Sequence, residues 1–221
     1  MKMHIVSLAA TAVAGLLLAV TATAATPQPA MPMAATPATA TATTAAPAQN
    51  WYGGPVYDGA PALGVTAALV KAGGGAANFS FPTALVNMLG QKTVNAEVAK
   101  LNKQYGEKKV QDFLNGMTYA VNTGLKEATK AGVKLPAPAD LSGSKLAAAL
   151  VTAGTASDGT FWSGLLFDKA LSHDLHNKVM MDININKSAV QDQTVHQVLN
   201  QAMYDVAQAL GMKQVKLAKL H

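Results

Sequence analysis

Two histidines and a methionine in the second half of the chain are the residues best suited to bind a metal. His173 and His176 stand in the run Ser-His-Asp-Leu-His, and Met180 follows His176 by four residues. On a helix, His176 and Met180 share a face, and His173 lies one turn earlier. Imidazole and thioether ligands of this kind bind copper or provide axial ligands to haem iron. The sequence therefore raises the hypothesis of a haem- or copper-binding protein that uses His173, His176 and Met180.

A structural interpretation of the same residues is preferred. The spacing differs from the i, i+4 histidine pair of a zinc-binding helix, and no glutamate accompanies it as in His-Glu-x-x-His. Ser172 can act as the N-cap of a helix that begins with these histidines. We therefore predict no cofactor and keep haem or copper as the alternative.

The signal for hydrolytic chemistry is poor. The chain has no Gly-x-Ser-x-Gly motif and only three glutamates from which a general acid could be chosen. An enzyme whose site the sequence does not identify is a second alternative, and a non-catalytic role is preferred. Five aspartates of the second half of the chain are expected on solvated helix faces, without a clear facing pair: Asp168, Asp174, Asp182, Asp192 and Asp205.

Charge and cysteine content exclude several classes of function. The formal net charge is +5, and every cationic side chain apart from histidine is a lysine. Proteins that read nucleic acid usually need the guanidinium group, so we expect no nucleic-acid partner. The charge allows only a weak attraction to an anionic envelope surface. The chain has no cysteine, which excludes disulfides and thiolate metal sites.

The N-terminal segment indicates export. Residues 1–24 combine Lys2, an apolar run and an Ala-Thr-Ala cleavage site, as in a secretory signal peptide. Residues 25–50 are almost entirely Ala, Thr and Pro, which predicts a disordered linker. We therefore expect a periplasmic or secreted protein of bacterial type, with no transmembrane segment after signal cleavage.

Residues 51–221 are predicted to form an all-α domain. Apolar residues recur every three or four positions, most clearly in the segment from Val110 to Ala131. Glycines end most of the periodic segments, as expected for helix C-termini. The predicted helices span residues 62–72, 81–89, 94–105, 107–131, 145–153, 161–171, 175–183 and 188–210.

An internal repeat is the second prediction about architecture. The run Ala-Ala-Leu-Val-Lys-Ala-Gly at 67–73 returns as Ala-Ala-Leu-Val-Thr-Ala-Gly at 148–154. Three further matches occur in the same order, and the four offsets are 81, 82, 85 and 82 residues. We therefore predict two tandem, similar four-helix units, at about 62–136 and 143–221.

One of these matches concerns four polar residues on the long helices. Asn115 and Tyr119 in the first unit are matched by Asn200 and Tyr204 in the second, each pair four residues apart. Such pairs flank one face of a helix and must find hydrogen-bond partners when buried. We predict that these four residues form a structural contact between the two repeats.

These observations favour an exported, non-catalytic helical binding or structural protein of the bacterial envelope. They leave its ligand, its partners and its oligomeric state open.

Overall fold

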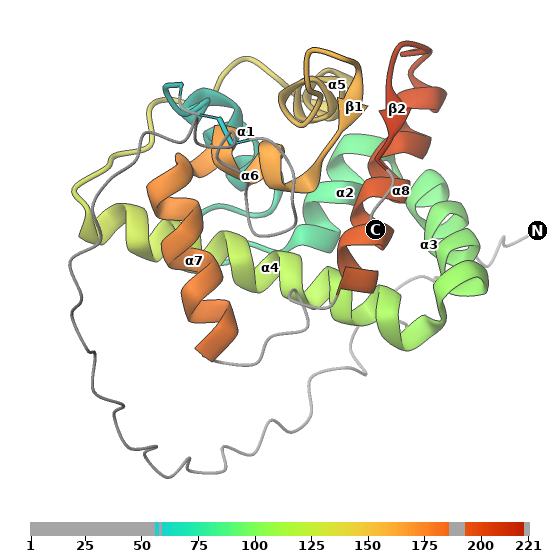
Figure 1. The fold of residues 1–221 in the computed structure, drawn as a ribbon, viewed down its shortest axis with the longest axis horizontal. Coiled ribbons are helices and arrows are strands. Elements are labelled where there is room, and N and C mark those ends of the chain that lie inside the picture. The colour runs from blue at the N-terminus through green and yellow to red at the C-terminus, as the bar shows by residue number, and fades with distance from the viewer. Residues whose placement is uncertain (1–55, 58, 186–192, 219–221) are drawn as a thin grey trace, which may run out of the picture. The chain divides into compact units, whose positions relative to one another are not determined.

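Helix α4 (Glu107–Lys130) is the longest described helix, and four other helices pack against it: α2, α3, α7 and α8 (Figure 1). Val110, Phe113, Met117, Ala120 and Ala128 are buried, and they recur at the spacing of one helix face. Acidic Glu107 in the first turn and Lys130 in the last turn complement the helix dipole. The apolar stripe predicted from the sequence is therefore the face that joins α4 to the core.

The computed structural model describes residues 56–57, 59–185 and 193–218. Within these residues the chain is mostly helical, which confirms the all-α class. Each of the eight predicted helices has a counterpart, with bounds that differ by a few residues. In chain order the other elements are α1 (Leu63–Ala72), α2 (Phe81–Leu89), α3 (Gln91–Tyr105), α5 (Gly143–Ala153), β1 (Thr160–Phe161), α6 (Ser163–Leu171), α7 (His173–Ile185), α8 (Gln193–Ala209) and β2 (Lys216–Leu217).

The short strands β1 and β2 form a parallel pair that the sequence did not predict. Thr160 pairs with Lys216 and Phe161 with Leu217. Strands of two residues are too short to produce an alternating pattern in the sequence. The backbone of Gly159 approaches Gln214 so closely that a Cβ there would lie 2.5 Å from the Gln214 carbonyl oxygen. This pairing holds the segment after α8 against the body.

The predicted signal peptide at 1–24 and linker at 25–50 lie outside the described residues, so both stay predictions. In the part of the chain that the structure does describe, no helix is long and apolar enough to cross a membrane.

Two glycines at helix ends allow a phenylalanine ring to pack against the backbone. Gly73 follows α1, and a Cβ at this position would lie 2.4 Å from the ring of Phe79. Gly154 follows α5, and a Cβ there would lie 2.2 Å from the ring of Phe161, which is fully buried. A ring enclosed in this way cannot move aside without disturbing the core.

We therefore predict that Gly154→Ala lowers the free energy of unfolding by about 1–3 kcal/mol, the usual cost of overpacking. The control is Gly64→Ala in α1, where a Cβ would lie an ordinary 3.6 Å from Ala139. That change should be neutral or stabilising by up to about 1 kcal/mol, because alanine favours helix. Urea denaturation of both variants checks the prediction, which equal stabilities would contradict.

Candidate functional site

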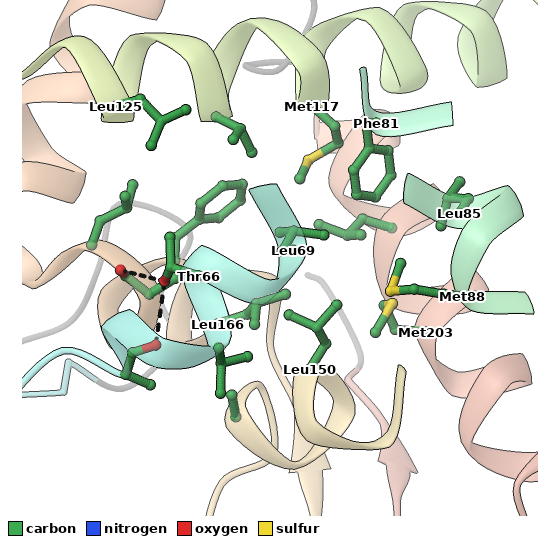
Figure 2. A pocket seen from close by; sticks show the side chains of 18 residues that line it. Thr66, Leu69, Phe81, Leu85, Met88, Met117, Leu125, Leu150, Leu166 and Met203 are labelled. Atoms are coloured by element: carbon green, nitrogen blue, oxygen red, sulfur yellow. Dashed lines mark hydrogen bonds between the residues drawn. The ribbon is translucent and has the colours of Figure 1, made fainter. Parts of the chain in front are cut away.

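An apolar cavity of about 60 Å³ lies among six helices: α1, α2, α4, α5, α6 and α8 (Figure 2). Figure 2 shows Leu69, Met117 and Phe81 around the cavity, with Leu150 and Leu166 on its other side. Both halves of the chain therefore contribute to its lining. The residues that line it are Ala62, Val65, Thr66, Leu69, Phe81, Leu85, Met88, Met117, Val121, Leu125, Leu150, Ala153, Leu166, Phe167, Ala170, Leu171, Leu199 and Met203.

Thr66 is the one polar side chain in this lining, and its hydroxyl is already engaged. Its Oγ1 lies 2.9 Å from the carbonyl oxygen of Ala170 and 3.3 Å from that of Ala62 (Figure 2). The hydroxyl proton is therefore directed at the backbone, so it is not available to a molecule in the cavity. The cavity presents carbon and sulfur to its contents.

A second apolar cavity, of about 40 Å³, adjoins the first. Phe81, Leu85, Leu199 and Met203 line both of them. At about 24 cal/mol per Å³, leaving the two cavities empty costs about 2 kcal/mol of stability. That is a noticeable fraction of the stability of a domain of this size.

A buried carboxylate with two imidazoles lies at the junction of α6 and α7. Asp168 in α6 and His176 in α7 are both fully buried, and His176 Nδ1 hydrogen-bonds Asp168 Oδ1. His173, at the start of α7, places its own Nδ1 3.3 Å from the same oxygen. An ionised carboxylate can only accept, so each imidazole donates from Nδ1 in this arrangement.

The surroundings of this group fix its orientation. The ring of Phe167 stacks on that of His176, with centroids 5.5 Å apart. The second carboxylate oxygen of Asp168 accepts a hydrogen bond of 3.4 Å from the Tyr57 amide. Asn177 lies 3.1 Å from His173 Nε2 and holds the ring from the other side. The side-chain positions are therefore set by neighbours on α6, α7 and the segment before α1.

The sequence hypothesis placed Met180 with the two histidines. Met180 is buried in the apolar core, and the carboxylate that joins both histidines comes from α6. The expectation that Asp168 lies on a solvated helix face is wrong, because its side chain is fully buried. Sequence spacing within α7 could not reveal this partner, because Asp168 belongs to the preceding helix.

A pair of carboxyl groups, Glu97 and Asp205, joins α3 to α8. Asp205 forms a salt bridge with Lys100 and accepts a hydrogen bond of 3.0 Å from Gln201. Burial beside the second cavity raises the pKa of Glu97 to about 7, and a hydrogen bond with Asp205 contributes to this shift. The expectation that the carboxylates lack a facing pair is therefore wrong for Asp205.

The four residues predicted to join the repeats have different surroundings. Asn200 is buried, and its Oδ1 accepts a hydrogen bond of 3.1 Å from the Ser163 amide at the start of α6. Tyr119 is partly exposed and donates to Asp182 Oδ2 in α7 at 2.6 Å. Asn115 is exposed and accepts from Gln111. Tyr204 is half-buried and packs against the core.

No family model, curated protein or solved structure matches the chain. Function is therefore argued from the geometry of the sites alone.

We predict that Glu97→Gln raises the free energy of unfolding at pH 8 and leaves it nearly unchanged at pH 4. The pKa of Glu97 rises on folding from 4.5 to about 7. Between these values the folded protein holds a proton that the unfolded chain has lost, so this group lowers stability as pH rises. The side chain is partly exposed, and solvent screening limits the gain at pH 8 to about 1 kcal/mol.

Urea denaturation at both pH values measures the effect. Glu107→Gln, which changes an exposed glutamate at the start of α4, is the control and should give no gain at pH 8. A Glu97→Gln effect of equal size at pH 4 and pH 8 would contradict the account.

Proposed function

We propose that this protein is an exported, non-catalytic binding protein that holds a small neutral apolar molecule in the cavity lined by both halves of the chain. The observation that carries the proposal is the near-complete absence of polar groups from the described lining of that cavity. Cavities larger than a water molecule are few in a domain, and those without polar partners stay dry. An apolar molecule that fits a dry apolar cavity therefore binds there with a favourable free energy.

The chemistry of the lining defines the ligand class. A charged or strongly polar ligand would lose its hydration without finding enough partners, because Thr66 is the one polar side chain in the described lining and its single hydroxyl proton is engaged by the backbone. Met88, Met117 and Met203 supply flexible, polarisable side chains that adjust to the shape of a guest (Figure 2). Small hydrocarbons fit this description, and a ring of the size of benzene fits when the methionine side chains shift and open the adjoining cavity of about 40 Å³.

The proposal includes an internal duplication, which explains why matching helices from both halves surround the cavity. The Phe81 amide, which begins α2, donates to Thr118 Oγ1 in α4 at 3.0 Å. The Ser163 amide, which begins α6, donates to Asn200 Oδ1 in α8 at 3.1 Å. Both members of the second bond lie 82 residues after those of the first. In this register Asn200 corresponds to Thr118, three residues from the Asn115 that the sequence match suggested.

Helix junctions give independent support for the duplication. Gly90, between α2 and α3, has φ 81° and ψ 146°, and Ser172, between α6 and α7, has φ 70° and ψ 155°. These positions are also 82 residues apart. The ends of α4 and α8 are also alike, since Gly132 and Gly211 both have φ 74°, although these two glycines are 79 residues apart.

Calorimetric titration with benzene tests the proposed binding, and phenol serves as a probe of similar shape with one polar group. We predict that benzene binds and that phenol binds at least about tenfold more weakly, because in most orientations its hydroxyl faces apolar side chains and only the Thr66 oxygen could accept its proton. Ala153→Leu, which fills part of the cavity, should weaken benzene binding by at least about tenfold.

The matched control is Ala96→Leu on the exposed face of α3, which should bind benzene as the wild type does. Absence of benzene binding, or equal binding by Ala153→Leu, would refute the proposal. Native mass spectrometry of protein purified from the exported fraction then identifies the natural ligand by its mass.

A further inference from the structure

The group formed by Asp168, His173 and His176 lies at the junction of α6 and α7, and none of its three side chains lines the apolar cavity. We propose that it binds one divalent transition-metal ion, and that zinc fits it best. The proposal does not depend on a ligand in the cavity, although it draws on the proposed duplication at two points, the register of the junction and the match of Ser172 with Gly90.

Geometry is the first argument. Each of the three residues offers one ligand atom, and these atoms all lie within 4.8 Å of one another. Zinc binds imidazole nitrogen and carboxylate oxygen at about 2.0–2.2 Å, so two ligands of one ion are at most about 4.4 Å apart. An ion would therefore replace the two Nδ1–Oδ1 hydrogen bonds, and side-chain shifts would bring one atom of each residue onto it.

The types of ligand are the second argument. Two imidazoles and one carboxylate form a known donor set of zinc sites that keep one coordination position open. The side chain of His173 is 29% exposed, which gives an ion a route to the group from solvent. Asp168 and His176 are fully buried, and a buried carboxylate is stabilised by a positive charge next to it. A divalent ion would supply that charge and would bind both imidazoles in their neutral form.

The matching junction in the first half is the third argument. In the 82-residue register, Asp168, His173 and His176 correspond to Val86, Gln91 and Val94. Helices α2 and α3 therefore form their junction without any acidic or imidazole side chain at these positions. The polar group at α6–α7 is thus not required by the fold of the junction, which favours a binding role.

Backbone strain at the same place is the fourth argument. Ser172 is the only described non-glycine residue with positive φ, and it immediately precedes His173. Its φ of 70° and ψ of 155° belong to a region that is favourable almost only for glycine, and Gly90 occupies the matching position. A strained backbone conformation directly before His173 is typical of functional sites, where the surrounding structure holds the ligands in place.

Neighbouring residues fit metal binding as well. When Nδ1 of a neutral imidazole binds a metal, its proton resides on Nε2, where an acceptor is needed. The Asn177 side chain lies 3.1 Å from His173 Nε2, and its amide can present either nitrogen or oxygen by rotating. Asn177 is therefore assigned as the group that orients His173 toward the ion.

Zinc binding by the full-length exported protein tests the proposal. Protein freed of metal with a chelator is dialysed against zinc, its metal content is measured by mass spectrometry, and its affinity by competition with a chromophoric chelator. Wild type should bind one zinc per chain. His173→Ala and Asp168→Asn should each lower the affinity by at least about tenfold, because each removes one of three ligands.

Asp174→Asn is the matched control, because Asp174 is an exposed carboxylate next to His173 and outside the group. Its zinc affinity should equal that of the wild type. Circular dichroism verifies the folding of each variant. If Asp168→Asn does not fold, the zinc affinity of His173→Ala tests the proposal, because His173 is partly exposed. Ala153→Leu should keep its zinc, so a failure of this proposal is distinguishable from a failure of the cavity proposal.

The proposal is overturned if wild type binds neither zinc, copper(II) nor nickel(II). It is equally overturned if His173→Ala keeps wild-type zinc affinity, because the ion is then bound elsewhere on the chain.

Discussion

The apolar interior shared by the two halves of the chain is the constraint on which the rest of the structure depends. Buried residues of all eight described helices form one continuous hydrophobic cluster. Each described helix is short or amphipathic, so its stability depends on this shared interior. The cavity lies inside the cluster, where the two halves meet without filling the space between them.

Several polar groups inside this interior have specific partners, and these partners connect helices that are distant in sequence. Asn200 satisfies the first amide of α6, and Thr118 does the same for α2. In α6 the preceding residue provides no side-chain cap, so the bond to Asn200 takes its place. In α2 the bond to Thr118 adds to the side-chain cap that the helix already has. The group of Asp168, His173 and His176 at the α6–α7 junction differs from these bonds, because the matching α2–α3 junction forms without such polar side chains. That difference is the reason to regard it as a site.

Helices could be predicted from the sequence because they depend on local spacing and on glycine stops. The stripe of Val110, Phe113 and Met117 predicted both the existence and the buried face of α4. The sequence identifies the two histidines as candidate ligands but not Asp168. The contact of Asp168 with the histidines depends on how α6 packs against α7, which is a tertiary contact. Periodicity places Asp168 on α6 and cannot tell how deeply that face is buried.

The cavity could not be predicted for a related reason. It arises where side chains from six helices fail to fill a space, and no single segment carries that information. The pKa of Glu97 is a similar case, because it depends on Asp205 in α8 and on burial beside the second cavity. Local sequence determines helices, whereas the sites depend on how the helices meet.

A crystal structure of the protein determined under xenon pressure tests the central claim most directly, because xenon occupies dry apolar cavities. The account predicts xenon density between Leu69, Met117 and Leu166, with ordered water absent from that space. Ordered water in the cavity, or a space closed by the surrounding side chains with no xenon bound, would contradict it.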